Sequence, residues 1–170
     1  LAQAEALADQ LQQQLAPQLQ DAYVQLVAHP LKASRAVFEL NRAVAMNQLH
    51  GQQGRASTNY WAEQVKFWFE TDAKLTAQYH ALGNGRWNHM MSQPHIGFTY
   101  WRNPPANLMP VVSVAEPMPV ADMGVAPEGS AFSWPISEYK GQPLELDPFY
   151  PHGQQQRAIE VFNKGSLPFE

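Results

Sequence analysis

The sequence contains no cysteine, and it has no apolar run approaching the roughly 20 residues that a membrane-spanning helix needs. The absence of cysteine excludes disulfides, zinc–thiolate sites and cysteine nucleophiles. It fits the cytosol, the periplasm and the medium equally, so it assigns no compartment. The sequence begins with Leu1 and shows no targeting segment, so we expect an internal part of a longer protein.

Basic charge is also scarce. There are 11 Lys and Arg against 15 Asp and Glu, a net charge of −4, and no basic patch of the kind that nucleic-acid binders carry. Residues 94–170 hold four basic and eight acidic residues and twelve of the 14 prolines. This shift predicts three regions. They are a helical bundle over 1–93, a signature loop with an extended Pro-rich strap over 94–155, and the start of a β-sandwich domain over 156–170.

Recognisable catalytic motifs are missing as well. The sequence has no GxSxG nucleophile elbow, no GxxxxGK[ST] or GxGxxG phosphate loop and no HExxH metal motif. A glycosidase needs two carboxyl groups roughly 5–10 Å apart, and the sequence pairs none. We therefore predict no catalytic residue, no metal ligand set and no cofactor within this chain.

Helix formers and regularly spaced apolar residues dominate the first half. Four helices are expected, over about 2–15, 17–28, 30–49 and 57–82. The second should end at His29-Pro30, because a residue before proline is disfavoured in the helical region. The fourth should end at Gly83-Asn84-Gly85, whose residues tolerate left-handed dihedrals.

The apolar spacing also predicts which side chains are buried. The inner face of the second helix should hold Leu19, Tyr23, Leu26 and Val27, and that of the third should include Phe38. Asn41 lies inside that stripe and is expected to be a buried amide bonded to a backbone group. Asp72 is expected to meet a basic or amide group from another helix.

Residues 156–165 alternate in hydrophobicity and predict a strand, which cannot be stable alone. The long irregular run before it holds aromatic residues that need burial, so the surface beneath it is expected to belong to another domain. The expected fold is mainly α, an antiparallel bundle of about four helices, then an irregular Pro-rich strap and a terminal β-strand.

Residues 86–101 (RWNHMMSQPHIGFTYW), called here the signature segment, are the richest in chemistry. Its two histidines could bind a metal if a third ligand came from elsewhere, could donate to backbone carbonyls, or could contact a substrate. Aromatic rings with amides nearby would also suit a sugar or a tight domain interface. The candidate binding residues, at a cleft edge or interface, are Trp87, His89, His95, Tyr100 and Trp101.

The signature segment resembles part of glycoside hydrolase family 115, the xylan α-1,2-glucuronidases. Further stretches resemble the same family in matching order, at residues 23–27 (YVQLV), 29–33 (HPLKA), 53–59 (QGRASTN), 104–105, 107–110 (NLMP), 124–130 (GVAPEGS), 134–135, 147–148, 155 and 159–165 (IEVFNKG). The departures are small, such as Phe98 where the family usually has Tyr. The resemblance covers nearly the whole chain beyond residue 15.

The resemblance implies a multidomain enzyme that removes (4-O-methyl)glucuronic acid from xylan and is periplasmic or secreted in bacteria. In that family an α/β domain and a (β/α)₈ catalytic barrel precede a helical bundle and a β-sandwich. This chain resembles the bundle and the strap, so no catalytic residue is carried over. The implied partners are the barrel and β-sandwich of the parent chain and, through them, the glucuronosyl substrate. Neither nucleic acid nor membrane is expected, and a homodimer stays open.

The alternative is a stand-alone carbohydrate-binding or domain-interaction module. It would use the five candidate residues of the signature segment as a sugar platform. A third interpretation is a histidine-based metal protein.

Overall fold

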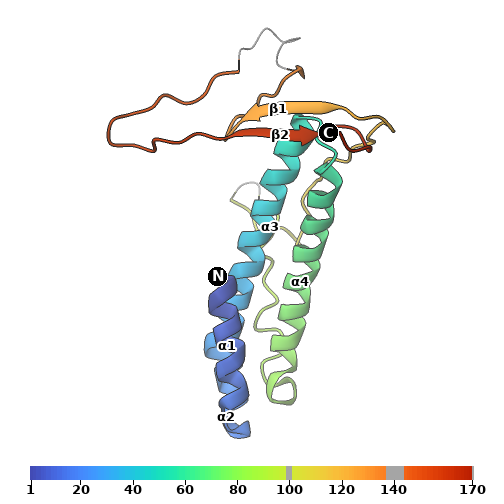
Figure 1. Ribbon diagram of the computed structural model, residues 1–170. Helices are drawn as coiled ribbons and strands as arrows, with labels where there is room; N and C mark the ends of the chain where they lie inside the picture. The colour runs from blue at the N-terminus through green and yellow to red at the C-terminus, as the bar shows by residue number, and fades with distance from the viewer. Residues whose placement is uncertain (99–100, 137–143, 170) are drawn as a thin grey trace. The chain divides into compact units, whose positions relative to one another are not determined.

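The computed structural model describes residues 1–98, 101–136 and 144–169 and is mainly helical, with one small antiparallel sheet (Figure 1). The elements are α1 (Ala2–Gln14), α2 (Pro17–Tyr23), the π-helix η1 (Val24–Ala28), α3 (His29–Gln52), α4 (Thr58–Gly85), β1 (Met123–Pro127) and β2 (Ile159–Asn163). The mainly helical class is therefore as expected, whereas the antiparallel bundle of four helices stays a prediction. None of the helices in the described part of the chain is long and apolar enough to cross a membrane.

The chain divides into two compact units. The first comprises residues 1–43 and 63–111, and the second comprises residues 44–62 and 112–170. Both α3 and α4 contribute residues to each unit. The signature segment belongs to the first unit, and most of the strap belongs to the second.

The expected helix end at His29-Pro30 is wrong, because the chain stays helical from Pro17 to Gln52 through the π-helix η1. The backbone N–H of His29 donates to the carbonyl of Val24, five residues earlier. Proline normally breaks a helix because its ring clashes with the preceding turn and its N–H is missing. A wider π-turn directly before Pro30 provides room for the ring, so the helix continues.

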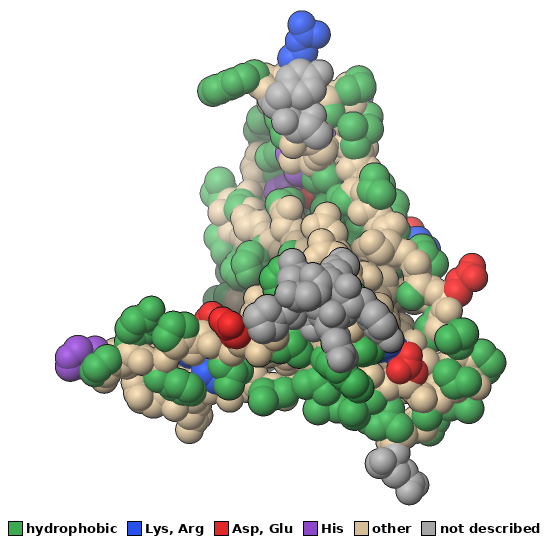
Figure 2. Space-filling view, turned by 90° about the horizontal axis from the view of Figure 1, so that it is seen from above, with side chains coloured by type: hydrophobic (Ala, Val, Ile, Leu, Met, Phe, Trp, Pro, Cys, Tyr) green, Lys and Arg blue, Asp and Glu red, His purple; other side chains and the backbone are tan. Residues whose placement is uncertain are grey.

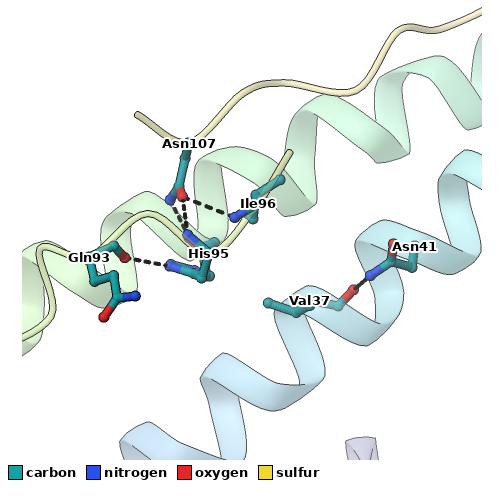
Figure 3. A network of polar contacts seen from close by, with 7 residues as sticks. Val37, Asn41, Gln93, His95, Ile96 and Asn107 are labelled. Atoms are coloured by element: carbon teal, nitrogen blue, oxygen red, sulfur yellow. Dashed lines mark hydrogen bonds and ion pairs between the residues drawn. The ribbon is translucent and has the colours of Figure 1, made fainter. Parts of the chain in front are cut away.

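Several predicted burial positions in the first unit are also wrong. Leu19, Leu26, Val27 and Phe38 are 51%, 73%, 44% and 56% exposed. Asn41 is exposed too, and its side chain donates to the backbone carbonyl of Val37 at 2.8 Å (Figure 3). Small residues, Ala28, Ala36 and Ala43, occupy the buried side of these helices instead. They allow close helix approach, and the larger apolar residues are left outside that contact.

Ion pairs and aromatic contacts join the helices of the first unit. Lys32 of α3 lies 2.7 Å from the carboxylate of Asp9 of α1. Arg35 pairs with Glu5 in the same way, and its guanidinium carbon lies 5.2 Å from the ring centre of Trp68 in α4. These contacts place α1 and α4 against the part of α3 in this unit.

The predicted end of α4 is confirmed. Gly83, Asn84 and Gly85 have positive φ angles of 56°, 57° and 82°. The dihedrals already leave the helical region at Leu82, and the N–H of Gly83 donates to the Asp21 carboxylate at 3.0 Å. This reversal places the signature segment against α4 within the first unit.

The second unit contains the sheet, and the predicted strand is confirmed as β2. Its partner β1 lies inside the strap, where no strand was predicted, and Val125 pairs with Val161 in an antiparallel register. A Cβ on Gly124 would lie 2.3 Å from the ring of Phe162, so only glycine fits beneath that ring. The Arg55 guanidinium lies 4.0 Å from the ring centre of Phe162.

Two asparagines hold the strap in the second unit. Asn47 donates to the carbonyl of Ser113 at 3.0 Å and accepts from its N–H at 2.7 Å, and it also donates to the carbonyl of Thr58 at 3.0 Å. Asn59 makes the same paired contact with Ala115, at 2.8 Å in both directions. Ordered side chains therefore replace the backbone partners that an extended segment would find in a sheet.

Candidate functional site

The signature segment folds as consecutive turns after α4. The N–H groups of Asn88, Met90 and Ser92 donate to the carbonyls three residues earlier, at 3.0, 3.2 and 3.2 Å. The N–H of Met91 donates to the His80 ring at 3.1 Å. His89 has a φ of +68°, uncommon for a residue other than glycine. The turns bring the chain to Pro94 and His95 beside α4.

A buried carboxylate in α4 holds this segment. Asp72 is 2% exposed, and its Oδ1 lies 2.8 Å from Nε2 of His95. Its Oδ2 accepts a longer bond of 3.4 Å from the amide of Asn107. A buried carboxylate is costly unless it is paired, so these two partners account for Asp72. The partners come from irregular chain, whereas a group from another helix was expected.

Asn107, whose contacts with His95 and Ile96 are drawn in Figure 3, ties the backbone of the segment to this carboxylate. Its Oδ1 accepts the N–H of His95 at 2.7 Å and that of Ile96 at 3.1 Å. Ile96 is 6% exposed, and its carbonyl accepts the N–H of Leu108 at 3.2 Å. Gly97 follows at φ +94°, where a Cβ would lie 2.7 Å from the Cβ of Leu108. The close approach of two chain segments therefore requires glycine at this position.

The charge of His95 is set by its neighbours. Burial alone would lower its pKa, but the hydrogen bond to Asp72, a second to the Gln93 carbonyl at 3.2 Å and the charge of Asp72 together raise the pKa of His95 above its usual value. Both partners are acceptors, so the doubly protonated ring satisfies both nitrogens. His95 in this form has no free N–H for a ligand.

His29 is the second histidine beside Asp72 and has the opposite character. It is 9% exposed, and its ring centre lies 4.7 Å from that of Tyr79. Burial lowers the pKa of His29, as do the charges of His80 and His95, against the opposing effect of Asp72. Among the described residues no hydrogen-bond partner is found for either ring nitrogen of His29. The neutral ring therefore keeps one donor and one acceptor free.

These groups line a pocket of about 410 Å³ in the first unit. Its wall contains the following residues: His29, Ala33, Asp72, Leu75, Thr76, Met90, Met91, Gln93, Pro94, His95 and Phe98. The volume lies within the usual range for small-molecule sites, which are mostly apolar with few polar groups.

Four of the five predicted site residues lie in the described part of the chain, and of these only His95 lines the pocket. Trp87 is half-buried, His89 and His95 are exposed, and Trp101 is fully exposed at 102%. Tyr100 lies outside the described residues. His89 lies near His80, with 6.1 Å between ring centres.

Within the described ranges, no three His, Asp or Glu side chains are grouped so that they could hold a metal ion. The two histidines of the signature segment are also engaged differently. His95 pairs with Asp72, and the Nδ1 of His89 lies 3.4 Å from the Ser92 hydroxyl.

Sequence reasoning missed Asn107, His29 and Thr76 as site residues. Asn107 lies 12 positions from His95, and no periodic pattern links the two. His29 was interpreted as a helix end and as part of a stretch that resembles the family, and not as a site residue. The one local signal was an acidic residue, Asp72, on an apolar helix face.

A comparison with protein-family models found no match, and a comparison with curated proteins found none either.

Proposed function

We propose that this chain is an accessory, non-catalytic part of an α-glucuronidase of the glycoside hydrolase family 115 type, which removes (4-O-methyl)glucuronic acid from xylan. The chain would comprise the four-helix antiparallel bundle, the strap and the start of the β-sandwich. The catalytic acids would lie in a barrel elsewhere in the parent chain. The resemblance of residues 85–110 to that family is the observation that carries the proposal.

The structural role of the signature segment supports this proposal. A buried carboxylate, Asp72, and a side-chain amide, Asn107, hold its backbone, and Gly97 permits the close contact that follows. A segment held in this way positions a surface, and it does not need reactive groups of its own. Such a role fits a part that supports a catalytic domain.

Exposed apolar surface gives further support. Hydrophobic side chains spread over the face shown in Figure 2. In the second unit Val114 is 74% exposed, Ile159 60% and Val161 57%. Large exposed apolar patches on soluble proteins mark interaction sites. The proposed neighbours, a barrel and the rest of a β-sandwich, would cover such surface.

Uronic-acid release from glucuronoxylan by this chain alone tests the proposal. We expect none above a buffer blank, because the chemistry would lie in the barrel. Steady release that scales with protein concentration would contradict the proposal. A preparation with a cooperative thermal transition serves as the control for folding.

A stand-alone carbohydrate-binding module is the second candidate, and the full exposure of Trp101 favours it. Rings on a surface can stack on sugar faces, so Trp87, His89, His95, Tyr100 and Trp101 would form the platform. Isothermal titration with xylo-oligosaccharides at millimolar concentration distinguishes the candidates. Saturable heat that disappears in the Trp101→Ala variant would favour this module, and no heat would exclude it.

A further inference from the structure

We propose that the pocket beside Asp72 binds an uncharged aromatic ring that carries one hydroxyl group, that is, a compound of the phenol class. The pocket holds about 410 Å³, enough for a substituted phenyl ring. It would take this ligand whether or not the chain belongs to a glucuronidase.

The apolar part of the wall selects a ring. Leu75, Met90, Met91, Pro94 and Phe98 provide aliphatic, thioether and aromatic contacts. Thioether sulfur interacts favourably with aromatic rings, and methionine adapts to irregular shapes. Met90 and Met91 are 58% and 36% exposed. A bound ring would therefore remove apolar surface of the protein from water.

The polar part of the wall selects one hydroxyl. His29 is buried and lines the pocket, and its neutral ring leaves one donor and one acceptor without partners among the described residues. Thr76 also lines the pocket, and no hydrogen bond to its hydroxyl is found in the described ranges. A phenolic hydroxyl can donate to one of these groups and accept from the other.

The charged part of the wall disfavours ions. The Asp72 carboxylate pairs with Nε2 of His95 across 2.8 Å, and Nδ1 of His95 lies 3.2 Å from the Gln93 carbonyl, so both ring nitrogens are engaged. An anionic ligand would find no free cationic donor there. A cationic ligand would have to compete with His95 for a carboxylate that is 2% exposed.

The small number of free polar side chains in the wall also favours a phenol over a sugar. A pyranoside carries three or four hydroxyl groups, and each one buried without a partner is costly. The free polar side chains of the wall are those of His29, Thr76 and Gln93, and much of the remainder is apolar. A single hydroxyl matches this wall better than a ring of hydroxyls.

Nitrogen-15 correlation spectra of the chain titrated with p-cresol test the proposal. We expect saturable shifts confined to the pocket residues, with a Kd of about 0.1–1 mM for a ligand of this size. Toluene should bind roughly 25-fold more weakly, because it lacks the hydroxyl and with it both hydrogen bonds, each worth roughly fivefold. Methyl β-xylopyranoside and benzoate should give no saturable shifts at the pocket.

Two threonine variants of α4 complete the test. Thr76→Val keeps the shape and removes the hydroxyl, so p-cresol affinity should fall roughly fivefold while toluene affinity is unchanged. Thr71→Val is the matched control, because the Thr71 hydroxyl donates to the Phe67 carbonyl and does not line the pocket. It should bind p-cresol as the unmodified chain does.

Three results of the titrations with the unmodified chain would overturn the proposal. The first is that p-cresol gives no saturable shifts even at a concentration about tenfold above the upper end of the expected Kd range. The second is equal affinity for p-cresol and toluene, and the third is xyloside binding as tight as cresol binding. The last would favour the carbohydrate-binding module. Loss of cresol binding in both threonine variants would also contradict it, because the effect would then not depend on the pocket hydroxyl.

Discussion

Replacing Asp72 with Asn should loosen the signature segment without unfolding the chain. Both oxygens of Asp72 accept hydrogen bonds, from His95 and from Asn107, whereas an asparagine side chain has one oxygen only. With that oxygen turned to His95, the new NH₂ group faces the NH₂ group of Asn107. If Asn107 turns over to relieve this, its oxygen leaves the N–H groups of His95 and Ile96.

The size of the effect follows from these bonds. A hydrogen bond to a charged group contributes about 1.5–3 kcal/mol. The lower end applies here, because the His95 side chain is 39% exposed and water can replace its partner. A loss of about 1.5 kcal/mol corresponds to roughly tenfold faster opening of the segment.

Amide hydrogen exchange is the suitable assay, because it reports local opening at the two N–H groups that Asn107 binds. In Asp72→Asn the amides of His95 and Ile96 should exchange roughly tenfold faster. Glu70→Gln is the matched control. Glu70 is on the same helix, its side chain is 66% exposed, and it lies 4.0 Å from Lys74. Unchanged exchange at both amides in Asp72→Asn, or the same acceleration in Glu70→Gln, would refute this account of the site.

Three further predictions concern the rest of the chain. Asn47→Ala should destabilise the second unit by about 3 kcal/mol, because it removes three hydrogen bonds at a fully buried position. Urea unfolding measures this loss, and an unchanged unfolding midpoint would contradict the prediction. Gly165→Ala should lower the melting temperature, because its Cβ would lie 1.9 Å from the Val120 carbonyl oxygen. The control Gly153→Ala, with 3.5 Å to its nearest neighbour, should not lower it. The raised pKa of His95 adds stability that is complete below the unfolded pKa of about 6.5 and is lost as pH rises through the folded pKa. The unmodified chain should therefore exceed His95→Gln in urea unfolding midpoint by more at about pH 5.5 than at about pH 8.5. A difference in midpoint that grows with pH would contradict the raised pKa of His95.

Features with a local physical cause could be predicted from the sequence. Alanine, glutamine and leucine favour helix, and α1 spans Ala2–Gln14 where a helix over about 2–15 was expected. The left-handed end at Gly83 and the strand β2 also follow from residues that are adjacent in sequence. Each depends on conformational preferences that act within a few residues.

Features that depend on distant partners could not be predicted. The partner strand of β2 begins at Met123, in a stretch whose prolines and glycine indicated loop. Asn47 binds Ser113, 66 positions away, and His95 binds Asp72, 23 positions away. The helix continues through Pro30 only because the π-helix η1 precedes it. The local sequence gives no sign of that π-helix, since a residue before proline normally indicates a helix end.

The central proposal is that this chain is the accessory part of a glucuronidase. The most direct measurement is uronic-acid release from glucuronoxylan by the product of the complete reading frame that encodes these 170 residues. We predict release of (4-O-methyl)glucuronic acid by that product and none by the 170-residue chain alone. A correctly folded complete product that releases no uronic acid would contradict the proposal.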